Sequence, residues 1–256
     1  EIKNNVTEPA IMDKLLEDNH ELLWIGTDRG LFYKKLEEGV LSPARSVRNE
    51  VLSGAAIIRI FKDSRSNLWI SAKNHGLFCL REEDRDSMNF VQYLSGPPGH
   101  NGYFDSDFYA IHEDRNGILW LGSGKGLRRF NLTDKTFEAD ARFNKLCPGK
   151  IIQVYGDGQD NLWIFHAKRG LIRYRHYSQE SNAIKVFDTE SGLPFDKFNT
   201  RFSYTNSFYQ SADGRLFISG SIGTGGFLWF HPDSIRDNEN VPNIVQTALN
   251  PGNREY

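Results

Sequence analysis

The chain has 256 residues, of which 39% are hydrophobic and 25% charged, and its 31 basic and 33 acidic side chains leave a net charge of -2. This balance argues against a general nucleic-acid binder or a membrane-surface binder, and no stretch approaches the roughly 18 apolar residues of a membrane helix. The chain has only two cysteines, Cys79 and Cys147, which does not indicate a disulfide-stabilised fold. Cys79 is expected to be a small, buried apolar side chain in a strand. The seven histidines show no metal-ligand spacing, so neither a metal nor a cofactor is expected.

In chain order, residues 1–10 (EIKNNVTEPA) are a polar lead-in, residues 11–240 form one repetitive domain, and residues 241–256 are a C-terminal tail. The domain divides into five units, which are expected at 11–56, 57–108, 109–150, 151–204 and 207–237. Residues 12–17 have a weak helical pattern, but they occupy the place of a first strand in the repeat and are expected to be one. Helical signals are otherwise almost absent, so the prediction is all-β.

The units share a motif in which an Asp precedes a Trp by six residues. Its full copies are DNHELLWIGTDRG (18–30), DSRSNLWISAKNHG (63–76), DRNGILWLGSGKG (114–126) and DGQDNLWIFHAKRG (157–170). A degenerate fifth copy, DGRLFISG (213–220), has Phe217 in place of the Trp. A repeat period of about 43 to 54 residues is the signature of a repeat architecture.

Each unit reads as a meander of about four short strands. Asn116-Gly117 and its counterparts, Ser66-Asn67 and Asp213-Gly214, form turns that admit positive φ, and the repeated Asp is expected to cap the turn. The apolar run that follows suits a strand buried on both faces. We therefore expect the four Trp side chains, and Phe217 in the fifth unit, to be buried between neighbouring units.

A sheet with two apolar faces cannot bury both alone, so the units must stack, and four strands every 43 to 54 residues are what a β-propeller blade requires. Five repeats favour a closed five-bladed ring, with an arc of a larger propeller as the alternative. An open arc would leave two apolar faces, for which we would expect a covering partner, such as a second chain in a homodimer.

The repeated LWIGT…GL, with its Asp six residues before the Trp, resembles the two-component regulator propeller repeat. The segment GGFLWFHPDSIRDNENVP (225–242) is similar to the passage by which those sensors leave their last blade. The resemblance implies the periplasmic sensor region of a Bacteroides-type hybrid two-component system histidine kinase. In that family an immunoglobulin-like sandwich follows, and residues 244–247 could be its first strand.

This resemblance implies an extracytoplasmic module that senses a ligand, with oligosaccharides as the ligand class, and no enzymatic activity. Two other classes stay open: a structural or protein-interaction propeller without a small-molecule site, and a glycan-cleaving enzyme. Residues 211–217 do resemble the Asp-box of sialidase-type propellers, but that box stabilises a turn and bears on fold only. The repeated Asp residues lie in equivalent turns of different blades, which fits capping better than a catalytic carboxylate pair.

The candidate ligand site is the face that carries the turn between the second and third strand of each blade, where every full unit has a cation. Two long loops are expected on the same face: residues 95–107, which are rich in Gly and Pro, and residues 191–199, which contain two Phe. Aromatic rings beside cations suit an acidic sugar. The candidate residues are Arg29, Lys73, His75, Lys125, Lys168, Arg169, Tyr103, Phe104, Phe195, Phe198 and Arg201.

Overall fold

The fold is all-β, as a computed structural model shows for residues 12–18, 20–37, 40–41, 43–94, 107–180, 182–188, 208–219 and 227–235. The strands of these residues form five antiparallel sheets, one for each predicted unit. Within a sheet, consecutive strands of the chain are hydrogen-bonded neighbours, as expected of a meander, except that the short fifth strand of the first sheet pairs with the third strand. No helix in these ranges is long and apolar enough to cross a membrane.

The first sheet consists of β1 (Met12–Glu17), β2 (Leu22–Thr27), β3 (Gly30–Glu37), β4 (Val40–Leu41) and β5 (Arg45–Ser46). The second consists of β6 (Ile57–Lys62), β7 (Leu68–Ala72), β8 (Gly76–Leu80) and β9 (Phe90–Tyr93). The third consists of β10 (Phe108–Glu113), β11 (Leu119–Ser123), β12 (Gly126–Asn131) and β13 (Thr136–Ala139). The fourth consists of β14 (Ile151–Gly156), β15 (Leu162–His166), β16 (Gly170–Tyr174) and β17 (Ile184–Phe187), and the fifth of β18 (Phe208–Gln210), β19 (Leu216–Ser219) and β20 (Phe227–Phe230).

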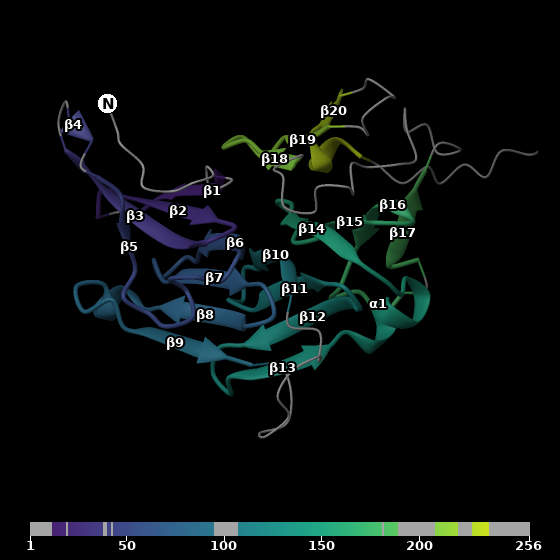
Figure 1. Ribbon diagram of the computed structural model, residues 1–256. Coiled ribbons are helices and arrows are strands. Elements are labelled where there is room, and N and C mark those ends of the chain that lie inside the picture. The colour runs from purple at the N-terminus through teal and green to yellow at the C-terminus, as the bar shows by residue number, and fades with distance from the viewer. Residues whose placement is uncertain are drawn as a thin grey trace, which may run out of the picture.

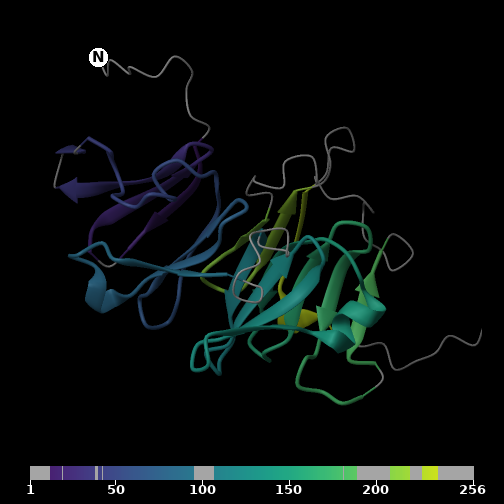
Figure 2. The same ribbon diagram turned by 60° about the horizontal axis from the view of Figure 1, so that its bottom comes forward.

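The sheets are the blades of a β-propeller. Figure 1 shows them following one another around an arc, from the purple first sheet on the left through the teal third sheet to the yellow-green fifth. Strands β6, β10 and β14 lie toward the centre, and β9, β13 and β17 lie toward the outside (Figure 1). The view turned by 60° shows the same succession (Figure 2). The predicted five-bladed propeller is thus confirmed, including β1 as a strand.

The turn between the first and second strand of each sheet has a left-handed residue. The φ values are 64° at Ser66, 76° at Gly117 and 85° at Gly214, in the three turns for which positive φ was predicted, and 57° at Glu21 and 63° at Asp160 in the other two. This turn sets the register in which the second strand buries its Trp, because a shift of one residue would move every side chain to the other face.

The core lies between consecutive sheets. Trp24, Trp69, Trp120 and Trp163 occupy equivalent positions in β2, β7, β11 and β15 and are at most 2% exposed, as predicted. Cys79 and Cys147 are buried free thiols, and burial raises the pKa of Cys79 to about 12. Cys79 therefore is the small buried side chain that the sequence indicated.

Two features differ from the sequence-based expectations. A short helix, α1 (Ala141–Leu146), connects the third and fourth sheets, and Asp140 caps it by accepting from the backbone N–H of Phe143 at 2.8 Å. Phe217 lies in the strand expected for it but is only half-buried.

The closing contact between the fifth and first sheets stays a prediction. Leu15 on β1, Tyr209 on β18 and Trp229 on β20 are 59%, 62% and 54% exposed, although a tightly packed closing interface would bury side chains of this size. The lead-in, the tail and residues 244–247 lie outside the described residues.

Candidate ligand face and the turns that support it

A single Asp organises the turn between the first two strands of each of the first four sheets. One carboxylate oxygen, Oδ1, accepts hydrogen bonds from the backbone N–H groups two and four residues later. For Asp114 these donors are Asn116 at 2.9 Å and Ile118 at 3.0 Å, and the same pair of bonds forms at Asp18, Asp63 and Asp157. The predicted capping role of the repeated Asp is therefore confirmed.

The second oxygen of the same carboxylate explains the six-residue spacing. Oδ2 accepts a hydrogen bond from the indole Nε1–H of the Trp in the following strand. The distances are 2.7 Å for Asp18–Trp24, 2.8 Å for Asp63–Trp69, 2.9 Å for Asp114–Trp120 and 2.8 Å for Asp157–Trp163. A buried indole N–H needs an acceptor, so the Trp that fills the interface requires the Asp that shapes the turn. These four carboxylates are thus engaged in structure.

The fifth turn is built differently. Ser211, not Asp213, occupies the position of the repeated Asp, because its N–H donates to the carbonyl of Arg215 at 2.9 Å, as Asp114 does to Ile118. Asp213 lies two residues later, is exposed, and accepts from the Ser211 hydroxyl. The Asp and the Trp are therefore replaced together, by Ser211 and Phe217. The phenyl ring has no N–H, so no acidic acceptor is required there.

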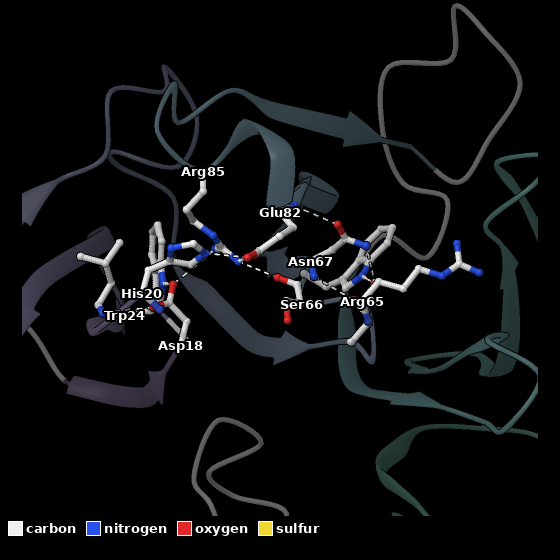
Figure 3. A network of polar contacts seen from close by, with 11 residues as sticks. Asp18, His20, Trp24, Arg65, Ser66, Asn67, Glu82 and Arg85 are labelled. Atoms are coloured by element: carbon white, nitrogen blue, oxygen red, sulfur yellow. Dashed lines mark hydrogen bonds and ion pairs between the residues drawn. The ribbon is translucent and has the colours of Figure 1, made fainter.

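Residues of the next sheet cover the first Asp–Trp pair, as Figure 3 shows. Arg85, whose side chain is 4% exposed, lies 5.8 Å above the Trp24 ring and places Nη1 3.5 Å from Oδ2 of Asp18. Its Nη2 donates to the Ser66 carbonyl at 2.6 Å and to Glu82 at 3.2 Å. This buried cation connects the turns of the first and second sheets.

A different set of groups covers the third Asp–Trp pair. His176 and Tyr177, which follow β16, lie over Asp114: the Tyr177 hydroxyl donates to Oδ2 at 2.7 Å, and Nε2 of His176 is 3.6 Å away. The His176 ring is 4.8 Å from that of Trp120. Burial opposes the charged form of Asp114, but the His176, Trp120 and Tyr177 contacts outweigh it and hold the pKa of Asp114 well below its usual range. Burial also raises the pKa of Tyr177 to about 12.

A third buried polar group joins two innermost strands that belong to non-adjacent sheets. Arg59 on β6 places Nη1 3.2 Å from the amide oxygen of Gln153 on β14, with the amide oriented so that its oxygen also accepts from Tyr155 at 3.1 Å. Burial lowers the pKa of Arg59 and raises that of Tyr155. The contact links the second and fourth sheets across the inner side of the third. Neither this contact nor the Arg85 and His176 clusters recurs among the described sheets, so no repeated sequence pattern points to them.

The turns between the second and third strands carry the predicted cations. Arg29, Lys73, His75, Lys125, Lys168 and Arg169 are all exposed there. In the first, third and fourth sheets the side chain that ends the second strand fixes this turn. Thr27 Oγ1 accepts from the N–H of Arg29 at 3.0 Å, and Ser123 Oγ accepts from that of Lys125 at 3.3 Å. In the fourth sheet His166 Nδ1 accepts from the N–H groups of Lys168 and Arg169, both at 3.1 Å. The backbone of these three turns is thus fixed, and their cationic residues are exposed.

The connection to the next sheet packs under these turns. At the third turn, Asn144 of α1 accepts from the Leu127 N–H and donates to the Leu127 carbonyl, both at 2.8 Å. Gly126 has a φ of 137° and lies so close to the Asn144 side chain that a Cβ would overlap it. Only glycine satisfies both conditions. Tyr103, Phe104, Phe195, Phe198 and Arg201 lie outside the described residues.

The fold and the repeated Asp–Trp turn define a β-propeller with one strand-turn-strand unit per blade. Residues 102–125 match the family model "Two component regulator propeller". The resemblance of the repeat to that family is thereby confirmed.

Relatives and solved structures agree with this class. The chain is 28% identical over 125 residues to Histidine kinase P4 of Formosa agariphila, a match that covers 47% of this chain and 8% of the kinase. It superposes with a TM-score of 0.67 and 19% identity on the extracellular domain of a putative hybrid two-component system from B. thetaiotaomicron, covering 88% of this chain and 28% of that one. A streptogramin B lyase superposes with a TM-score of 0.54 and 14% identity, covering 88% and 70%. The chain is therefore a propeller domain that resembles extracellular sensor domains of two-component systems, and it spans a small part of their length.

Proposed function

We propose that this propeller is a ligand-sensing module of a periplasmic two-component sensor and that its ligand is an acidic oligosaccharide. The observation that carries the ligand class is the recurrence of exposed cations in the turn between the second and third strands of four sheets. In a propeller these turns lie at one end of the ring, so a chain of uronic or sulphated sugars could contact several of them together. The module is proposed to bind its ligand without cleaving it, since the repeated Asp carboxylates are engaged by turns and indoles.

The exposure of the cations sets the expected strength of the interaction. A charge-assisted hydrogen bond contributes about 1.5–3 kcal/mol when it is desolvated, whereas an exposed ion pair contributes about 0.2–1 kcal/mol. The cations of these turns are exposed, so each of their contacts with the sugar is expected to contribute about 0.2–1 kcal/mol. Binding should also weaken as salt rises, because the Debye length is only about 8 Å at physiological ionic strength.

Isothermal titration calorimetry with acidic and neutral oligosaccharides of equal length tests the proposal. Lys125→Gln combined with Lys168→Gln should weaken binding of the acidic sugar by about 2- to 30-fold, the equivalent of two exposed pairs. Lys135→Gln is the matched control, because Lys135 lies in the turn between β12 and β13, which opens onto the opposite end of the blade. Equal affinity for both sugars, or equal loss in all variants, would contradict the proposed ligand class.

The likeness to a lyase makes a propeller enzyme the second candidate. Mass spectrometry of the same oligosaccharides after prolonged incubation with the protein separates the two. Intact sugars are expected. Shortened products that persist after repeated purification of the protein would favour the enzyme.

A further inference from the structure

The innermost strands of the second and fourth sheets begin beside the cationic turns. The N–H of Lys73 donates to the carbonyl of Ala56, just before β6, at 2.8 Å. The N–H of Ala167 donates to the carbonyl of Lys150, just before β14, at 2.9 Å. These strands and β10 lie toward the centre of the arc (Figure 1), where the strands of a propeller surround a central channel. The first residues of β6, β10 and β14, together with Lys150, are called the inner border of the ligand face.

One cation of the inner border reaches across the inner side of the third sheet. Arg59, Ala110 and Gln153 occupy equivalent positions of β6, β10 and β14, each opposite the residue two places after the Trp. With the Gln153 amide oriented as described above, its oxygen accepts from Nη1 and Nη2 of Arg59, at 3.2 and 2.5 Å. The equivalent residue of the intervening strand, Ala110, has only a methyl side chain and so does not block this contact. The guanidinium is thus positioned by a neutral amide of another sheet.

A second cation of the inner border is held over an aromatic ring. Nζ of Lys150 lies 4.0 Å from the centre of the Tyr109 ring, a contact that favours and orients the ammonium. Asp107 also favours the charged form of Lys150, and its Oδ1 accepts from a backbone N–H of the second cationic turn at 2.6 Å. Lys150 precedes Gln153, which holds Arg59, by three residues, a separation of about 10 Å along a strand. One sugar residue and the two long side chains can span this separation.

Both cations are desolvated while part of their surface stays accessible. Arg59, Tyr109 and Lys150 are half-buried, whereas the cations of the turns are exposed. Burial lowers the pKa of Arg59 and of Lys150, and it raises the pKa of Tyr155, whose hydroxyl contacts Gln153. Several perturbed groups gathered at one place are typical of functional sites. An anionic group beside the two cations would offset the cost of burying their positive charge.

We propose that the inner border binds the carboxylate of a uronic acid residue, with Arg59 and Lys150 as its cationic partners. The planar guanidinium matches the two oxygens of a carboxylate, and its five N–H donors allow more than one acceptor. The ammonium of Lys150 adds a single-point contact. The inference rests on the proposed function for the class of ligand, an acidic sugar. It assigns the acidic group of one sugar residue to the innermost strands and leaves the exposed turns to the rest of a longer chain.

A protein-observed NMR titration of the 256-residue chain with glucuronate tests the site, with glucose at the same sodium concentration for comparison. Glucuronate should shift the amide resonances of β6, β10 and β14, and glucose should shift them far less. Lys150→Gln should weaken glucuronate binding by about 3- to 10-fold, since a half-buried cation is lost. Lys185→Gln is the matched control and should bind as the wild type does. Lys185 also lies over a ring, 5.3 Å from that of Phe187, but on β17, the outer strand of the fourth sheet.

Arg59→Lys keeps the positive charge and removes the planar fork. It should weaken glucuronate binding by about 10-fold, because the two-point contact with the carboxylate is lost. Urea denaturation shows whether this variant folds, and if it does not, Lys150→Gln and its control decide the matter. The proposal is overturned if glucuronate causes no shifts at high concentration, if Lys150→Gln leaves its affinity unchanged, or if Lys185→Gln reduces the affinity equally.

The titrations with acidic oligosaccharides separate this site from the proposed function. If the acidic sugars bind through Lys125 and Lys168 and Lys150→Gln leaves their affinity unchanged, the proposed function stands and the inner site is wrong. If acidic and neutral oligosaccharides bind equally while binding of glucuronate depends on Lys150, the inner site stands as a carboxylate site and the proposed ligand class fails.

Discussion

The indole Nε1 of Trp69 lies 2.8 Å from Oδ2 of Asp63, and both residues are buried, at 2% and 4% exposure. The same carboxylate accepts from the backbone N–H groups of Arg65 and Asn67 at 3.0 and 2.8 Å. One side chain therefore forms the turn and satisfies the polar atom of the residue that fills the interface. The two tasks cannot be separated by mutation of the Asp.

Replacing this Asp should destabilise the protein strongly. Asp63→Ala leaves the buried indole N–H and the turn amides without their acceptor, at an expected loss of about 2–4 kcal/mol in the free energy of unfolding. Asp213→Ala is the control within the chain, since Asp213 is exposed and has no indole partner, and it should change stability far less than Asp63→Ala does. Urea denaturation of both variants is the measurement. Similar losses for both would contradict the assigned role of the repeated Asp.

The fifth turn predicts a non-additive pair of substitutions. Trp69→Phe removes the donor of the hydrogen bond and Asp63→Ser removes the acceptor, which together recreate the Ser211–Phe217 combination. The double variant should be more stable than the sum of the single losses predicts, by about 1–2 kcal/mol. A complete double-mutant cycle in urea measures this coupling. Additivity to within about 0.3 kcal/mol would mean that the two residues act independently.

His112 should make the protein less stable in mild acid. Its ring lies against the backbone of Gly156 in the fourth sheet, and burial lowers the pKa of His112 to about 4. The unfolded chain, with a His pKa near 6.5, binds more protons between these values, so stability falls as the pH drops from about 6.5 to 4. The expected loss is about 1–3 kcal/mol.

Denaturant titrations at pH 7.5, 6.5, 5.5 and 4.5 test this dependence. His112→Gln should flatten the curve in this window, whereas His75→Gln, at an exposed turn, should leave it as in the wild type. If His112→Gln keeps the full acid dependence, another group is responsible.

Arg85 should contribute far more to the stability of the protein than Arg81, a neighbouring exposed arginine. Arg85→Ala removes the cation beside the buried Asp18 carboxylate and exposes the Trp24 ring, at an expected cost of about 2–4 kcal/mol. Arg81→Ala removes pairs with Glu83 and Asp84 from a side chain that is 49% exposed, where water and salt screen ion pairs, so it should lower stability far less than Arg85→Ala does. Thermal unfolding of the two variants compares them directly. Equal decreases in melting temperature for the two variants would show that the buried contacts of Arg85 do not stabilise the protein more than the exposed pairs of Arg81.

The sequence by itself determined the blades. The positive φ at Ser66 and Gly117, the turn role of the Asp and its hydrogen bond to the Trp arise within single units, from contacts at most six residues apart in the chain. Such contacts recur with the repeat, so the pattern reveals them. The repeated apolar position of the Trp also predicted its burial, although the surface that covers it belongs to the next sheet. The fifth turn was aligned incorrectly from the sequence, because Asp213-Gly214 resembles the Asp at the start of the motif. In the structure Ser211 occupies the position that the repeated Asp has in the other turns.

Only the tertiary structure decided what joins one blade to the next. Arg85 over Asp18, His176 beside Asp114 and Arg59 at Gln153 connect residues that are 62 to 94 positions apart, and each pair uses different chemistry. The exposure of Tyr209 and Trp229 likewise depends on whether another sheet lies against them. A local pattern fixes which side of a strand is apolar, but the neighbour that covers that side is set by the packing of whole sheets, because burial is a property of two surfaces together.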